Sequence, residues 1–145
     1  TTMSAIKNLP EGLHSATRYI AAYPDRQENR DFDSAYTSRF GDHPTNWSWE
    51  TAVATDFLIS AIQETKSLNP KNISESLKGK SRQSFIGVGE GNTVTMRSKD
   101  QTLVNYAIGW GSTLPKEPYM KGVKAADWES IQELEKEWLT SKGWI

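Results

Sequence analysis

Few residues in this chain have the types and spacing that catalysis or metal binding requires. The 145 residues include two histidines, His14 and His43, and no cysteine, which excludes disulfides, thiolate chemistry and thiolate metal sites. Neither histidine stands in a metal-ligand spacing such as HExxH. No GxSxG pentapeptide offers a nucleophile elbow. His43 lies in the turn GDHPTN, where we expect a solvated polar residue.

Two glycine-containing stretches match phosphate-binding loops only in part. Residues 78–81 read KGKS, but Ser74 stands where a P-loop requires glycine, and the stretch follows a predicted helix rather than a strand. Residues 87–91 read GVGEG but open a strand, so no helix N-terminus is there to hold a phosphate. Glu50 and Asp56 are six residues apart, so they are expected on different faces of their helix and do not form an obvious acid/base pair. The sequence therefore predicts no enzyme, no cofactor and no metal.

The aromatic residues are the remaining candidates for a site. Six tryptophans and five tyrosines occur in the chain, and Trp47 and Trp49 lie at the start of its most apolar predicted helix. Rigid rings at such a position line small-molecule sites, but tryptophan also serves as core. From the residue types alone both interpretations of Trp47 stay open, with core packing favoured. Trp128 and Trp138, at helical spacing, are expected in the core.

The composition limits the class of protein. Hydrophobic residues make up 36% and charged residues 24%, with a net charge of −1 and a mean hydropathy of −0.66. Lysine and arginine are scattered, so the basic face typical of a nucleic-acid binder is not predicted. No window approaches the roughly 20 apolar residues of a membrane span. The length fits about one domain.

The elements that would position these residues alternate between strand and helix, which predicts an α/β layered architecture. In chain order we expect a strand at 12–23; a helix capped by Asp25 and ending at Phe40 before Gly41; a helix at 46–66 capped by Thr45 or Asn46; a short helix between Asn69 and Gly79; strands at 94–96 and 102–108; a loop at 112–122; and a last helix capped by Asp127.

The helix at 46–66 has apolar residues on two sides, which predicts packing from both. One stripe consists of Trp49, Ala52, Val53, Phe57 and Ala61, and the other of Trp47, Ala54, Leu58 and Ile62.

Several phrases, read in order, resemble the C-terminal part of the periplasmic solute-binding proteins of branched-chain amino acid type ABC transporters. They are EGL at 11–13, ENRDFDSAYTSRFGDHP at 28–44, NWSWETAVATDFLISAIQET at 46–65, NPKNISESLKG at 69–79 and a glycine-rich stretch at 85–101 that ends in TMRSKDQ. The best match covers residues 12–111 of the single stretch 1–145, leaving 112–145 as a linker and an amphipathic helix. The stretch resembles a subgroup that is often associated with aromatic acids and whose members often have a histidine between this aspartate and this glutamine. Here Asp100 is followed directly by Gln101, so the ligand class stays open.

The resemblance implies a partial type I periplasmic-binding-protein fold, with three-layer αβα lobes, present as a C-terminal fragment. It implies a periplasmic component that binds a small amino acid or an aromatic or organic acid between two lobes and passes it to an ABC permease, without catalysis or cofactor. The family's aromatic contact falls on Trp47, with Asn46 and Trp49 as weaker candidates by adjacency. Incomplete lobes would favour self-association or pairing with the remaining portion.

Other functions stay open at this stage. A sensory ligand-binding domain would share the fold and the site. A small α/β hydrolase would need a titratable cluster in a closed pocket. An interaction module would use the tryptophan-rich last helix as its partner surface.

Overall fold

The structure is a computed structural model that describes residues 5, 6 and 8–145. Its named elements, in chain order, are β1 (His14–Thr17), α2 (Gln27–Phe40), α3 (Asn46–Thr65), α4 (Pro70–Leu77), β2 (Ser81–Gln83), β3 (Thr93–Met96), β4 (Leu103–Val104), β5 (Gly109–Thr113), β6 (Met120–Ala125) and α5 (Trp128–Ser141).

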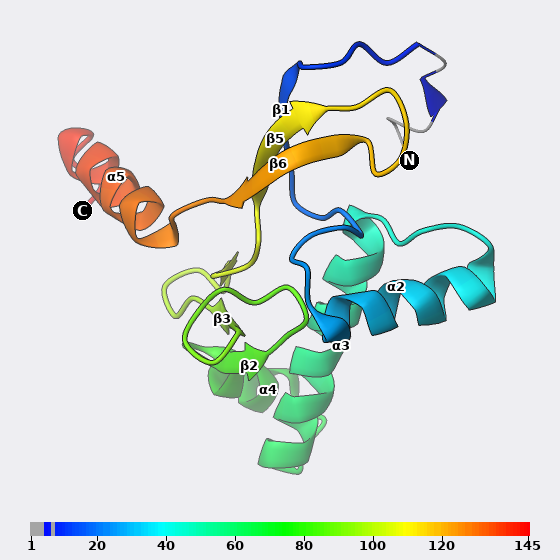
Figure 1. Ribbon diagram of the computed structural model, residues 1–145. Coiled ribbons are helices and arrows are strands. Elements are labelled where there is room, and N and C mark those ends of the chain that lie inside the picture. Colours follow the sequence, from blue (N-terminus) through cyan, green and yellow to red (C-terminus); the bar gives the residue numbers. More distant parts are fainter. Residues whose placement is uncertain (1–4, 7) are drawn as a thin grey trace.

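These elements form two halves that are joined by extended segments (Figure 1). The helical half contains α2, α3 and α4 together with an antiparallel sheet of order β2-β3-β4. The sheet half is an antiparallel sheet of order β1-β5-β6. The chain crosses from β1 to α2 and returns from β4 to β5, so two crossing segments connect the halves.

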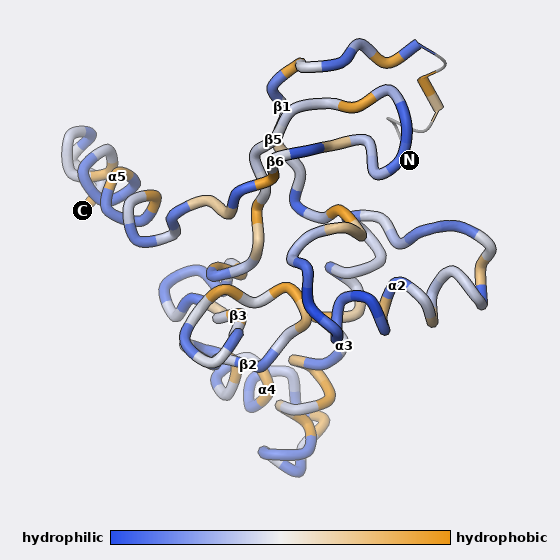
Figure 2. Tube along the Cα trace, in the orientation of Figure 1, coloured by the Kyte–Doolittle hydropathy of each residue, from blue (hydrophilic) through white to orange (hydrophobic). Residues whose placement is uncertain are grey.

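The core of the helical half forms along one side of α3. Trp49, Val53 and Phe57 are buried and pack with Ile86 and Val94 from the sheet side. The first predicted stripe of α3 is thus confirmed as core. The second stripe is exposed instead of packed: Trp47 is 70% and Leu58 46% exposed. Figure 2 shows hydrophobic residues recurring along α3 between hydrophilic ones.

Local capping signals explain where most helices begin and end. Thr45 precedes α3, and its backbone N–H donates to the Ser48 hydroxyl (3.0 Å) as half of a capping box. The Asn69 side chain accepts from the first turn of α4, with Pro70 at its first position. Gly41 ends α2 at φ 76°, a left-handed conformation that glycine adopts without steric cost.

The start of α2 differs from the prediction. The helix begins at Gln27, with Arg26 rather than Asp25 at the N-cap position and without a side-chain capping bond. The Asp25 carboxylate pairs instead with Arg30 on the first turn.

The sheet half was only partly predicted. The strand expected at 12–23 is confined to His14–Thr17, which pairs with β5 in the register Ala16 to Trp110. The strand expected at 102–108 is broken at Asn105, whose φ of 63° is left-handed. The loop expected at 112–122 is wrong: Met120–Ala125 forms β6 and pairs with β5.

Helix α5 projects from the junction of the two halves (Figure 1). The Asp127 carboxylate caps it by accepting from two backbone N–H groups of the first turn, as predicted. The Trp128 indole N–H donates to the Tyr106 carbonyl (2.6 Å), and Glu135 pairs with Arg97 (2.5 Å). The prediction that Trp138 lies in the core is wrong. Its side chain is 50% exposed, and Trp144 is the only described aromatic residue whose ring packs against it.

Candidate functional site

The first turn of α3 meets the segment that crosses from β1, so side chains from both halves lie together there. The Thr17 hydroxyl donates to the Tyr19 carbonyl (2.7 Å), which turns the backbone at the end of β1. The same hydroxyl lies 3.4 Å from the Asn46 amide oxygen at the start of α3. Thr17 and Asn46 line one surface at this junction, whereas their neighbours Arg18 and Trp47 lie together on another.

The first surface, here termed the Trp47 face, consists of Arg18, Trp47 and Glu50. The Arg18 guanidinium lies 5.5 Å from the centre of the Trp47 ring, a cation–π arrangement. Its Nη1 also lies 2.6 Å from the Glu50 carboxylate, one helical turn after Trp47. Trp47 is 70% exposed. A flat ring therefore faces solvent beside one cation and one anion.

Tyr106 lies behind this face, on the segment that returns to β5. Burial raises the pKa of its hydroxyl, with Arg18 opposing that rise and Glu50 adding to it. Its ring packs between Trp49 (5.2 Å) and Trp128 (4.9 Å). Tilted ring contacts among Trp49, Tyr106 and Trp128 therefore lie close to the Trp47 face.

The second surface is a cleft of about 520 Å³ between the two halves, here termed the hinge cleft. Asn46 lines it, together with Thr17 and Tyr19 from the crossing segment. The loop between α2 and α3 forms one wall and the loop between β5 and β6 the other. Its size is in the range of small-molecule sites.

The three site residues predicted from the sequence are not brought together. Asn46 lines the hinge cleft, whereas Trp47 lies on the Trp47 face. Trp49 is 1% exposed and belongs to the core; its indole nitrogen is buried without a hydrogen-bond partner among the described residues. Successive helical residues are about 100° apart, so adjacency in sequence does not place these side chains on one surface.

A cluster that the sequence analysis missed surrounds His43. Its Nδ1 lies 2.6 Å from the Asp33 carboxylate on α2, and its Nε2 lies 2.6 Å from the Glu117 carboxylate in the β5–β6 loop. The hydrogen bond with Asp33 raises the pKa of His43; partial burial opposes this, and Glu117 adds to it. His43 is exposed, as expected, but its carboxylate partners were not predicted, because they are distant from it in sequence.

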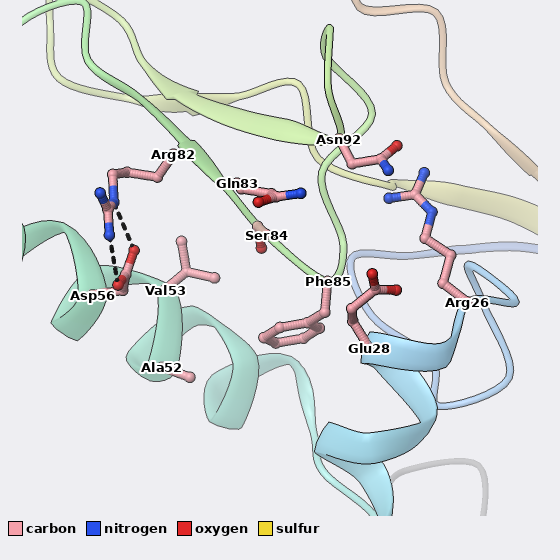
Figure 3. Close-up of a pocket in the computed structure, with 10 residues that line it drawn as sticks. All are labelled: Arg26, Glu28, Ala52, Val53, Asp56, Arg82, Gln83, Ser84, Phe85 and Asn92. Atoms are coloured by element: carbon pink, nitrogen blue, oxygen red, sulfur yellow. Dashed lines mark hydrogen bonds and ion pairs between the residues drawn. The ribbon is translucent and has the colours of Figure 1, made fainter.

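A second cavity, of about 350 Å³, lies between the start of α2, the middle of α3 and the β2 region (Figure 3). Arg82 forms two hydrogen bonds with the Asp56 carboxylate (2.9 and 3.1 Å) at one end. Arg26 donates to the Gly87 carbonyl (2.6 Å) at the other. Both arginines are therefore engaged within the chain, as Arg18 is with Glu50 on the Trp47 face.

Within residues 5, 6 and 8–145, no group of three or more histidine, cysteine or acidic side chains is arranged to hold a metal ion. Over the same residues, no helix has the length and apolar character needed to span a bilayer.

The comparisons with known proteins give structural neighbours only. No protein-family model matches the sequence, and no curated protein matches it. A solute-binding protein of an ABC transporter from Rhodopseudomonas palustris BisB5, solved with 3,4-dihydroxybenzoic acid, is similar in structure (TM-score 0.64, 18% identity, 79% of this chain and 30% of that one).

Two further solved structures give the same result. One is an ABC-type branched-chain amino acid transporter protein from Rhodopseudomonas palustris CGA009 (TM-score 0.66, 17% identity, 87% of this chain and 32% of that one). The other is an amino acid ABC transporter substrate-binding protein from Pseudomonas fluorescens Pf-5 (TM-score 0.64, 17% identity, 86% and 33%).

The chain has part of the type I periplasmic-binding fold and spans about a third of the length of these solved proteins. The fold class predicted from the sequence is thereby confirmed.

Proposed function

We propose that this chain contributes one side of the solute site of an ABC importer's solute-binding protein, located in the periplasm. The observation that carries the proposal is the Trp47 face: an exposed tryptophan ring beside the Arg18–Glu50 pair, at the junction of the two halves. Sites for small solutes combine an apolar wall with a few oriented polar groups. The structural neighbours, which are solute-binding proteins, support the same assignment.

The Trp47 face suggests which solutes would bind. The Arg18 guanidinium can donate two hydrogen bonds to a solute carboxylate, and the Trp47 ring can stack on an aromatic or aliphatic side chain. Glu50 can accept hydrogen bonds from an ammonium group. An amino acid would use all three residues, whereas an aromatic acid would use Arg18 and Trp47 and would be repelled by Glu50.

This difference gives a direct test by isothermal titration calorimetry with leucine and 3,4-dihydroxybenzoate. Trp47→Ala is expected to weaken binding at least about tenfold, as truncation of a central aromatic contact does. Glu50→Gln is expected to weaken leucine binding and to leave or improve binding of the aromatic acid. Trp144→Ala is the matched control, since Trp144 is similarly exposed (64%) but lies beyond α5. Equal affinities of the Trp47 and Trp144 variants would refute the assignment.

We further propose that the complete solute-binding unit includes structure beyond these residues, either in a longer chain or in a second polypeptide. The exposed stripe of α3, with Trp47 and Leu58, supports this, since an apolar helix face of this kind is usually covered. Native mass spectrometry of the purified chain tests the second possibility: a dimer or a complex would support pairing, and a monomer at all concentrations would exclude it for the chain alone.

The transport partner follows from the same proposal. A solute-binding protein of this kind would pass its solute to the ABC permease, and Trp47 would be covered in the closed form. Protection of Trp47 from acrylamide quenching on addition of solute would support such closure. Trp110→Phe, Trp138→Phe and Trp144→Phe together remove the fluorescence of the other exposed rings.

A further inference from the structure

The imidazole of His43 connects the two halves of the molecule. It belongs to the loop between α2 and α3, at the mouth of the hinge cleft. One ring nitrogen lies 2.6 Å from Asp33 in the helical half, and the other lies 2.6 Å from Glu117 in the β5–β6 loop of the sheet half. Among the described residues, this is the only polar side-chain contact between those two loops.

Both contacts require the charged form of the imidazole. An ionised carboxylate only accepts hydrogen bonds, so each ring nitrogen must carry a proton to donate to its partner. A neutral imidazole has one N–H and one lone pair. On deprotonation, one of the two carboxylates would therefore face a lone pair and lose its hydrogen bond.

The surroundings of His43 are acidic on every side that contacts it. Asp33 faces it from α2, Glu117 from the β5–β6 loop, and Asp42 accepts from the His43 backbone N–H within its own loop (2.8 Å). No ion pair between a lysine or arginine and any of these three carboxylates is found among the described residues. The imidazolium is thus the cation that holds the cluster together.

The contacts of His43 with Asp33 and with Glu117 differ in exposure, and this difference determines which of them breaks first. The Asp33 side chain is 22% exposed and is fixed on a helix, whereas the Glu117 side chain is 61% exposed and lies in a loop. Neutral His43 is expected to keep its proton on Nδ1, facing Asp33. The contact that deprotonation removes is therefore the one that crosses between the halves.

We propose that His43, Asp33 and Glu117 form a proton-operated latch that holds the two halves together across the hinge cleft. The latch is closed in acid and opens as the pH rises through the pKa of His43, which lies above its usual value. It acts on the angle between the halves and does not depend on which solute binds. Because the pair with Glu117 is partly exposed, we expect it to change the closed population by roughly two- to fivefold.

The chain is well suited to a spectroscopic test. It has only two histidines, so the NMR signals of the His43 ring can be assigned with His14→Gln. It has no cysteine, so Ser38→Cys on α2 and Lys116→Cys on the β5–β6 loop give a unique pair of spin-label sites. The label distance is measured at about pH 5.5 and about pH 8.5, on either side of the ordinary histidine pKa.

The expected result is a short label distance in acid that becomes longer or broader at high pH. Glu117→Ala, which removes the acceptor for Nε2, should lower the pKa of His43 and should give the broad distribution at both pH values. Glu90→Ala, which removes an exposed carboxylate from the β2–β3 loop, should behave as the unmodified chain. A distance that is independent of pH, or a His43 pKa that is the same in the Glu117 and Glu90 variants, would overturn the latch.

Discussion

Replacing Asn29 with alanine is expected to destabilise the protein by about 3 kcal/mol, although the site is polar and lies outside the main apolar cluster. Asn29 is fully buried on α2. Its amide nitrogen donates to the carbonyls of Ala21 (3.0 Å) and Pro24 (3.1 Å), and its oxygen accepts from the Tyr19 hydroxyl (3.2 Å). One side chain thus holds the crossing segment against the helical half.

The magnitude follows from the groups left behind. Alanine would leave the Ala21 carbonyl and the Tyr19 hydroxyl without a partner, whereas the Pro24 carbonyl would keep its bond from the Arg26 backbone N–H (2.9 Å). Each buried polar group without a partner costs about 1–3 kcal/mol, and water that reaches the site lowers this cost. Tyr19→Phe removes one bond and the hydroxyl together, so about 1 kcal/mol is expected. Burial raises the pKa of that hydroxyl, so it is a neutral donor at ordinary pH.

Urea unfolding followed by circular dichroism measures both variants. Asn72→Ala is the matched control, because Asn72 lies exposed on α4 and shares any gain in helix propensity from alanine. It should change the free energy of unfolding by less than about 0.5 kcal/mol. If Asn29→Ala behaved like Asn72→Ala, the three hydrogen bonds would contribute nothing net and the reasoning would be refuted.

Three further predictions concern α5 and the β2-β3-β4 sheet with its loops. Asp127→Ala removes the acceptor for two backbone N–H groups and should cost α5 about 1 kcal/mol, seen as faster amide exchange in its first turn. Gly87→Ala would place a methyl group 2.3 Å from the Asn92 carbonyl oxygen, so a loss of more than about 2 kcal/mol is expected in thermal unfolding. The hydrogen bond from Arg97 lowers the pKa of Asp100 to about 2. The pair is partly exposed, so it should stabilise the fold only slightly; this stabilisation should be present above the usual aspartate pKa and should disappear as the pH falls towards 2. Acid unfolding of the unmodified chain and of Arg97→Gln measures the difference.

The helices were predictable because their signals are local. Asn69 followed by Pro70, and Asp127 before the last apolar repeat, identify helix starts within a few residues of sequence. In the same way, Gly41 identifies the end of α2 and Thr45 identifies the start of α3. In each case the residue that gives the signal forms the hydrogen bond or the backbone conformation that it predicts.

The sheet half and the His43 cluster could not be predicted in this way. Strand β6 reads MKGVKA, with two lysines and a glycine, so its alternation is weak, and it is stabilised by pairing with β5. His43 was interpreted from its turn alone, but its two partners come from a helix and from a distant loop. Contacts between residues that are distant in sequence depend on the topology of the fold, which cannot be predicted from composition or periodicity.

Helix α3 illustrates what periodicity does and does not determine. Its two apolar stripes look alike in sequence, yet Val53 and Phe57 are buried while Trp47 and Leu58 face solvent. A stripe records that a helix face is suited to burial, but not which segment covers it. The buried stripe is covered by residues of this chain, such as Ile86 and Val94. The exposed stripe begins at Trp47, whose ring also stacks under Arg18, so any segment that covered Leu58 and its neighbours would form the next wall beside the proposed solute site. Completion of the fold and completion of the site are therefore expected to occur together.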